Sequence, residues 1–185
     1  MPSLRRLLPL TFCLCLTACA NEEPESDFND QLPLLSAAEQ GDLPGISRLI
    51  AESPEVDIRD ACLWTPLMKA ALNGHPEAVR QLLEAGAEVN LTDKGGYSAL
   101  MLAASNNHAA IIDMLLAAGA NPNQVEQTGG FDALIWAAQL GHSAAVERLL
   151  ASPVDRSRRD SEGKSAEDWA RENGHQQVLR LLGGD

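Results

Sequence analysis

The sequence predicts an all-α protein, a solenoid of about five stacked helix-turn-helix units. A polar residue that suits a helix start recurs at spacings of 33, 34 and 33 residues, at Thr65, Ser98, Asp132 and Ser165. Ten residues after each of these a histidine follows, at His75, His108, His142 and His175. A period in this range indicates units stacked side by side, because a unit of this length cannot bury its apolar side alone.

Within each period the residue types predict two short antiparallel helices. The polar residue at the first position can accept a hydrogen bond from a free amide of the first turn, and Pro66 suits the first helical position. Val79, Leu82 and Leu83 form an apolar stripe at the spacing of a second helix. Before each histidine stands a residue that tolerates the left-handed conformation and so ends the first helix: Gly74, Asn107, Gly141 and Gly174.

We place the repeat domain at residues 32–185. Its units are an N-terminal cap without a hairpin at 32–59, then 60–92, 93–126 and 127–159, and a C-terminal cap at 160–185. In the last unit Glu167 and Arg171 stand at positions that are apolar in earlier units, and polar residues there suit a cap that faces water.

The repeat resembles the ankyrin repeat, and its fullest copy runs from Asp60 to Thr92. That copy contains Thr65-Pro66-Leu67, Ala70-Ala71, Gly74-His75, Leu82-Leu83 and Gly86-Ala87. The resemblance implies hairpins between units and a protein-binding role, with contacts from hairpin tips and the outward side of the first helices. Two positions depart from the family pattern: Leu63 replaces a glycine, and Ser152-Pro153 replaces Gly-Ala. We expect these departures to affect the first hairpin and the fourth inter-unit loop.

Residues 1–18 resemble the signal peptide of a bacterial lipoprotein. Two arginines precede an apolar run from Leu7 to Leu16, which is too short to span a bilayer but fits an export signal. Leu16-Thr17-Ala18-Cys19 resembles a lipobox, which implies cleavage between Ala18 and Cys19 and lipid on Cys19. An ordinary export signal, cleaved without lipidation, is the alternative.

Residues 19–31 are expected to be the lipidated cysteine and a flexible acidic tether, because they lack apolar periodicity. Ala20 is not the aspartate associated with inner-membrane retention, so the resemblance to Gram-negative lipoproteins implies the outer membrane. Residues 20–31 can reach at most about 40 Å. We therefore expect the repeat domain to lie close to that membrane and to face the periplasm.

Composition argues against a nucleic-acid partner. Without the two signal arginines, twelve basic residues stand against 26 acidic ones, a net charge of −14. Phosphate binding requires clustered cations. One basic group occurs around the last hairpin, at Arg156, Arg158, Arg159 and Lys164, and we interpret it as a solvated loop.

The four histidines do not predict a metal site or an enzyme. Stacked helices lie about 8–10 Å apart, whereas zinc holds a histidine nitrogen at about 2 Å. Copies in neighbouring units therefore cannot share a metal, and the ankyrin pattern places a turn-stabilising histidine here. The sequence also lacks a phosphate loop, a Ser-His-Asp arrangement and paired metal-binding cysteines. We expect no catalysis, no metal and no cofactor.

A recurring set of residues predicts a concave protein-binding face. Trp64, Tyr97 and Phe131 each precede the polar residue at the helix start, and Lys164 takes this position in the last unit. Aromatic side chains are frequent anchors at protein interfaces. The alternative is that each ring packs on the next hairpin, and Trp136 and Trp169 are interpreted as packing residues between units. A second set, on the same side of the first helices, comprises Leu72, Asn73, Ser105, Asn106, Gln139 and Leu140.

Together these features favour a non-enzymatic interaction module, tethered to the outer membrane, that binds one periplasmic protein. Two narrower alternatives follow from the resemblance to small exported ankyrin proteins. One is an immunity-type inhibitor of a toxin delivered to the periplasm. The other is an accessory factor for a periplasmic oxidative-stress enzyme such as catalase.

Overall fold

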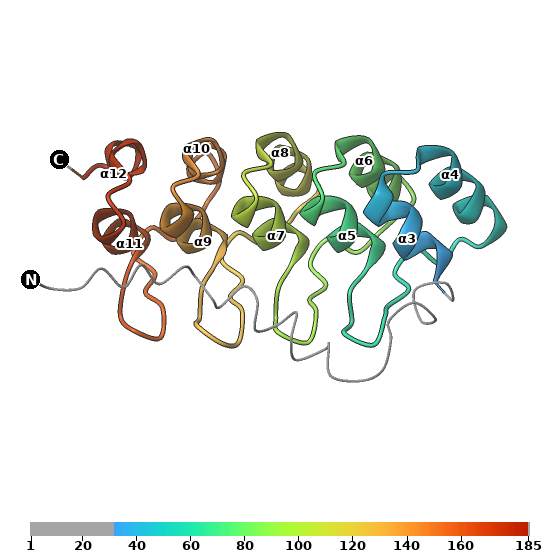
Figure 1. The fold of residues 1–185 in the computed structure, drawn as a ribbon, viewed down its shortest axis with the longest axis horizontal. Coiled ribbons are helices and arrows are strands. Elements are labelled where there is room, and N and C mark those ends of the chain that lie inside the picture. Colours follow the sequence, from blue (N-terminus) through green and yellow to red (C-terminus); the bar gives the residue numbers. More distant parts are fainter. Residues whose placement is uncertain (1–31, 185) are drawn as a thin grey trace, which may run out of the picture.

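The computed structural model describes residues 32–184, so the interpretations of the signal peptide, Cys19 and the tether lie outside the described residues. Within this range ten α-helices form two layers, and hairpin loops extend from the first layer (Figure 1). The first layer comprises α3 (Pro33–Gln40), α5 (Pro66–Leu72), α7 (Ala99–Ser105), α9 (Ala133–Leu140) and α11 (Ala166–Glu172). The second layer comprises α4 (Leu43–Glu52), α6 (Pro76–Glu84), α8 (Ala109–Ala117), α10 (Ser143–Leu150) and α12 (Gln176–Leu182).

Each helix contacts its partner in the other layer and the next helix of its own layer. These contacts confirm the predicted all-α solenoid of five helix-turn-helix units. None of the helices between residues 32 and 184 is both long and apolar enough to cross a membrane.

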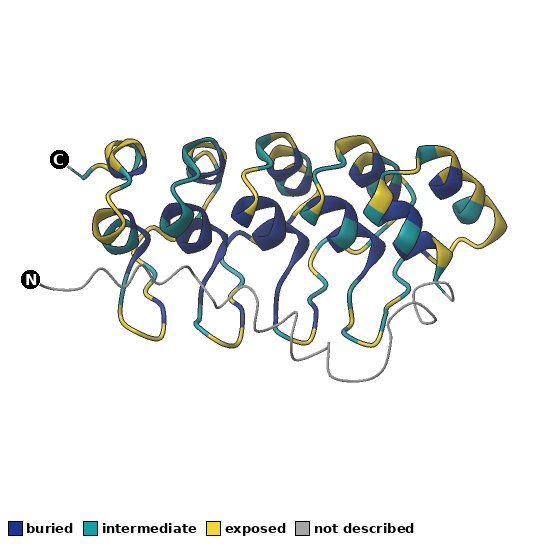
Figure 2. Cartoon of the chain, in the orientation of Figure 1, coloured by how far each residue is buried: buried dark blue, intermediate teal, exposed yellow. Residues whose placement is uncertain are grey.

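The core lies between the two layers and between successive units (Figure 2). The alanine pairs Ala70-Ala71 and Ala103-Ala104 have no exposed surface, and their small side chains let neighbouring helices approach closely. Leu82 and Ile112, on the second helices, are also fully buried. Burial of each such large side chain contributes roughly 1.5–3 kcal/mol.

The four predicted helix caps are all present. The side chains of Thr65, Ser98, Asp132 and Ser165 each accept a hydrogen bond from the amide three residues later, at 2.8–3.4 Å. Ser165 and Asp168 form a reciprocal capping box, because the amide of Ser165 also donates to the Asp168 carboxylate at 2.9 Å.

The predicted helix ends are also confirmed. Gly74, Gly141 and Gly174 have φ angles of 74–77°, and Asn107 takes the same left-handed conformation with a φ of 59°. The Asn107 side chain also forms a contact that glycine cannot form, because its Oδ1 accepts a hydrogen bond from the Ala145 amide at 3.1 Å. Asparagine therefore replaces glycine here while adding a contact to the next unit.

Loops that follow the second helices are connected by a ladder of side chains. Asp57 accepts from the amide of Glu88, Asn90 from that of Asn121, and Asn123 from that of Asp155, at 2.7–3.2 Å. Each of these bonds joins one unit to the next. The ladder therefore fixes how far each unit is displaced from its neighbour.

A carboxylate organises each hairpin. Asp60, Asp93 and Asp160 each accept hydrogen bonds from the amides two and four residues later, at 2.8–2.9 Å. The remaining hairpin has one more residue before its aromatic, and there Glu126 accepts from the amides of Gly129 and Phe131, at 2.7 and 3.0 Å. Glutamate has one methylene more than aspartate, which lets its carboxylate reach across the longer loop. The extra residue of this hairpin accounts for the spacing of 34, instead of 33, between Ser98 and Asp132.

The two departures from the family pattern have different outcomes. Leu63 adopts the left-handed conformation of a hairpin glycine, with a φ of 65° against 87° at Gly96. Ser152 does not adopt the positive φ of its counterparts Gly86 and Gly119, and its hydroxyl instead donates to the Leu149 carbonyl at 2.6 Å. The first hairpin therefore keeps the family backbone, whereas the fourth inter-unit loop changes it.

The match between Glu126 and its longer hairpin can be tested by shortening both. We expect Glu126→Asp to lower the free energy of unfolding by about 1–2 kcal/mol, because the shorter carboxylate cannot reach both amides. Combining Glu126→Asp with deletion of Thr128 gives Asp-Gln-Gly-Gly-Phe, the counterpart of the segment from Asp93 to Tyr97. This double variant should recover most of the loss in equilibrium urea unfolding. A double variant that is less stable than Glu126→Asp alone would show that the side-chain length is not matched to the loop.

Candidate protein-binding face

The three aromatic residues predicted as exposed anchors occupy equivalent places in their hairpins, but two of them are buried. Tyr97 is 6% exposed and Phe131 is 9% exposed, whereas Trp64 is half-buried. The expectation of exposure is therefore wrong for Tyr97 and Phe131. The alternative interpretation, in which the rings pack between units, describes them correctly.

The physical reason is a ladder of rings that crosses the junctions between units. Trp136, from α9, lies between Tyr97 and Phe131, with ring centroids 6.0 and 4.9 Å apart respectively. Phe131 in turn contacts Trp169 of α11, with centroids 5.7 Å apart. Edge and tilted contacts of this kind add about 0.5–1.5 kcal/mol per pair to the burial of the rings. The packing role predicted for Trp136 and Trp169 is confirmed.

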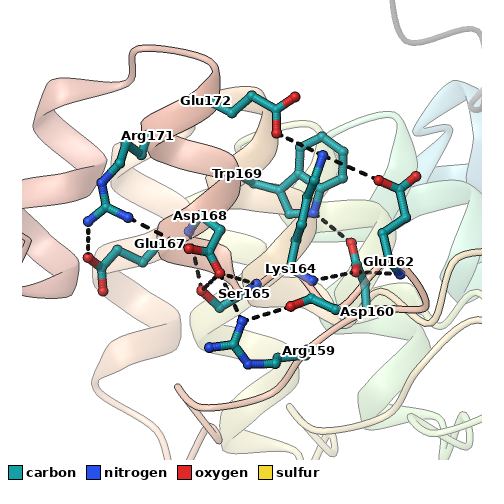
Figure 3. Close-up of polar contacts among 11 residues, drawn as sticks. Arg159, Asp160, Glu162, Lys164, Ser165, Glu167, Asp168, Trp169, Arg171 and Glu172 are labelled. Carbon is teal, nitrogen blue, oxygen red and sulfur yellow. Dashed lines mark hydrogen bonds and ion pairs between the residues drawn. The ribbon is translucent and has the colours of Figure 1, made fainter.

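A lysine lies over an aromatic ring in the second unit and again in the last. The Lys69 ammonium is 5.1 Å from the centre of the Trp64 ring, and it also lies 3.6 Å from a Glu39 oxygen. The Lys164 ammonium is 4.0 Å from the centre of the Trp169 ring (Figure 3). Lys164 thus stacks on the ring of its own unit instead of continuing the aromatic series.

Six residues at the ends of the first helices were predicted to extend the face. Ser105 is buried and its hydroxyl donates to the Leu102 carbonyl at 3.0 Å, so it is not an outward-facing contact residue. Asn73 and Asn106 are exposed, and each side-chain amide donates to a carbonyl four residues earlier, both at 2.9 Å. Leu72, Gln139 and Leu140 are half-buried.

The surface that remains is the hairpin-helix face: Trp64, Leu72, Asn73, Asn106, Gln139, Leu140 and Lys164. All of these side chains are at least partly accessible, and they come from four successive units. Tyr97, Ser105 and Phe131 are buried and do not belong to this face.

Each histidine connects its unit to the preceding one. Its Nε2 lies 3.0–3.1 Å from a main-chain carbonyl at the end of the previous first helix: that of Glu39, Leu72, Ser105 or Gln139. Because a carbonyl can only accept, Nε2 must carry the proton. A β-carbon added to Gly74 would lie 2.5 Å from the His108 ring, so the glycine also makes room for the histidine. The turn-stabilising role predicted for the histidines is confirmed.

The histidines are therefore engaged with the backbone in the described structure. No group of three or more His, Cys, Asp or Glu side chains between residues 32 and 184 is arranged to hold a metal ion. Burial lowers the pKa of His142, which keeps this imidazole neutral at pH 7 although its hydrogen bond to the Ser105 carbonyl acts in the opposite direction.

A family model for ankyrin repeats, in three copies, matches residues 34–126. The chain belongs to the ankyrin-repeat family. The matched segment covers the first three units, and the two units that follow continue the same helix pairs. No curated protein sequence matches this chain closely enough to count as a relative. Ankyrin repeats are typically non-catalytic modules that bind proteins, so the family supports protein recognition in general.

The basic group at the last ankyrin hairpin is largely neutralised by carboxylates. Lys164 lies 3.2 Å from Glu162 and 2.7 Å from Glu172, and Arg159 lies 3.1 Å from Asp168 (Figure 3). A hydrogen bond with Glu172 raises the pKa of the Lys164 ammonium. The interpretation of this group as an ordinary surface loop, not a phosphate-binding patch, agrees with these pairs.

Sequence reasoning missed the buried carboxylate of Asp132. Its side chain has no exposed surface, its Oδ1 accepts from the Ile135 amide at 2.8 Å, and its Oδ2 accepts no hydrogen bond from the described residues. Arg158 Nε lies 3.8 Å from that Oδ2. Burial raises the pKa of Asp132 to about 6, against the opposing effects of the Ile135 amide and Arg158. Two features of the sequence could have indicated it. Asp132 is an aspartate where the other three helix caps are Thr or Ser, and Arg158 stands two residues before the hairpin aspartate Asp160.

Because its pKa is raised in the folded state, Asp132 should make stability fall as pH rises. Its contribution is fully favourable below the unfolded pKa of about 3.9 and is lost as pH passes through about 6. Asp132→Thr keeps a helix cap but cannot ionise. We expect the unfolding free energy of this variant, relative to the natural protein, to rise by about 2–3 kcal/mol between pH 4 and pH 7.

Urea unfolding of both proteins across that pH range measures the difference directly. Other titrating groups cancel in the comparison, and Arg158 stays protonated throughout. A constant difference between the two proteins at all pH values would contradict the raised pKa.

Proposed function

We propose that this protein is a non-enzymatic interaction module, tethered to the bacterial outer membrane by lipid on Cys19, that binds a periplasmic protein through its hairpin-helix face. The observation that carries the proposal is the distribution of charge between the two helix layers of the three middle units. Lys69 is the single charged residue in α5, α7 and α9, whereas α6, α8 and α10 contain six.

That asymmetry matters because the buried centres of protein interfaces are depleted in charged residues. The hairpin-helix face of the three middle units offers amides and partly exposed apolar groups, at Leu72, Asn73, Asn106, Gln139 and Leu140. The opposite layer exposes acidic and basic side chains that suit contact with water, including Glu77, Arg80, Asp113, Glu147 and Arg148.

Rigidity supports the same proposal. The ring ladder and the histidines join successive units, and a carboxylate braces each hairpin from within. A partner that binds such a face does not have to order it first, and avoiding that entropy loss raises affinity.

The proposed anchor depends on the lipobox-like sequence that ends at Cys19. The described domain begins thirteen residues after this cysteine, so the intervening chain would keep the domain within about 40 Å of the bilayer. More than one acyl chain is needed for stable attachment, and lipoproteins of this type usually carry three.

The anchor is tested by metabolic labelling. We expect radiolabelled palmitate to be incorporated into the full-length chain and into outer-membrane fractions that contain it. The Cys19→Ser variant should lose both the label and the membrane fractionation. Incorporation that is equal in the two chains would reject Cys19 as the acylated residue.

The face is tested by site-specific photo-cross-linking in cells that express the full-length chain. A photoreactive amino acid is placed at Asn73, Asn106 or Leu140, with Asp113 and Glu147 on the opposite layer as exposed controls. We expect one and the same protein to be cross-linked from all three face positions and from neither control. Adducts that form only from the controls, or from no position, would reject the proposed face.

A further inference from the structure

The first hairpin contains a strained residue, Leu63, at the position that glycine occupies in the other three hairpins. Leu63 has a φ of 65°, and its amide donates to the Asp60 carbonyl at 2.9 Å. The equivalent bonds in the hairpins of Gly96 and Gly163 are 3.1 and 3.0 Å long, with φ angles of 87° and 79°. Glycine takes this conformation without strain, whereas a leucine has to hold its β-carbon too close to the following carbonyl.

Nothing in the described core compensates for that strain. Leu63 is 37% exposed, one of two large apolar side chains so exposed among residues 32–184, and it does not pack against the hydrophobic core. Asn107 is the other non-glycine residue with positive φ in the described range, and its side chain accepts a hydrogen bond from the next unit. Backbone strain of this kind clusters at functional sites, including the places where ligands and partners are held.

The carboxylates nearest to Leu63, Asp60 and Asp93, are at least half-buried and bound to main-chain amides, so the exposed charges around the tip are cationic. Trp64 follows it and is half-buried, and two exposed cations flank the tip along the chain and on the next hairpin, Arg59 and Lys94. The main-chain amide of Lys94 donates to the Cys62 carbonyl at 3.0 Å, so Lys94 adjoins the first hairpin directly. Neither cation forms an ion pair within residues 32–184, in contrast to Arg159 and Lys164 of the last hairpin.

We infer that the tip of the first hairpin inserts Leu63, with Trp64 beside it, into an apolar pocket of the protein partner, and that acidic side chains line the rim of that pocket. This inference rests on the proposed function and names one contact within it. The apolar pair supplies the buried centre of the contact. Arg59 and Lys94 supply a basic rim on a chain whose formal net charge is −12, so the complementary surface is acidic.

The first test places the photoreactive amino acid at Leu63 in the full-length chain, in cells. Val125 is the matched control, because it has the same 37% exposure but lies where no positive φ is required. We expect a protein adduct from position 63 and none from position 125. Mass spectrometry should locate the cross-link on the partner among apolar residues flanked by aspartate or glutamate.

The second test uses the protein identified in that adduct, purified, as the binding probe. Leu63→Gly should raise the Kd at least tenfold, as expected for an anchor at an interface. The same variant should raise the melting temperature by a few degrees, because it relieves strain. Lys94→Glu should slow association, and raised salt should weaken this effect.

The outcomes separate the inference from the proposed function. Cross-linking of one protein from Asn73, Asn106 and Leu140 but not from Leu63 would overturn the inference and leave the face standing. An adduct from Leu63 that contains only lipid, or a Kd that Leu63→Gly leaves unchanged, would also overturn it. No protein adduct from any of these positions would remove both.

Discussion

The offset between successive units is the constraint on which this structure depends. Burial of side chains such as Leu82 and Ile112 supplies the favourable free energy, but apolar contact is not directional and tolerates sliding. Directional hydrogen bonds remove that freedom. The histidine-to-carbonyl bonds, the Asp/Asn ladder and the hairpin-to-hairpin amide bonds each join one unit to the next. Each bond contributes only about 1 kcal/mol net to stability. Together, however, these bonds allow each unit only one displacement relative to its neighbour.

Much of the fold could be predicted because local rules decide it. A cap at Thr65, a left-handed residue at Asn107 and an imidazole at His108 depend on a few neighbours in the chain, and the repeat supplies several independent copies of each. The extra residue in one spacing could also be seen in the sequence. Its compensation by Glu126 could not, because the reach of a carboxylate to two amides is a property of the folded hairpin.

The binding face was harder to predict, for a physical reason. The position of a residue within the repeat predicts on which side of a hairpin it lies, but it does not predict which other side chains cover it. Tyr97 and Phe131 have the phase of exposed residues and are buried by Trp136, which comes from a different position of the repeat. Ser105 likewise satisfies its hydroxyl on its own helix. Contacts between different positions of the repeat have no periodic signature, and the pair formed by Asp132 and Arg158 escaped detection for the same reason.

The burial of these rings changes how a partner would be recognised. If Tyr97 and Phe131 were exposed anchors, each unit would contribute a similar aromatic contact, and specificity would depend on spacing alone. Since the rings instead brace the hairpins, the side chains that differ from unit to unit remain outside: Leu72 with Asn73, then Asn106, then Gln139 with Leu140. Recognition by such a face would depend on a particular order of leucine and amide side chains held at fixed positions. A rigid ladder that buries two of the three hairpin rings would therefore favour selectivity for one partner over unspecific binding.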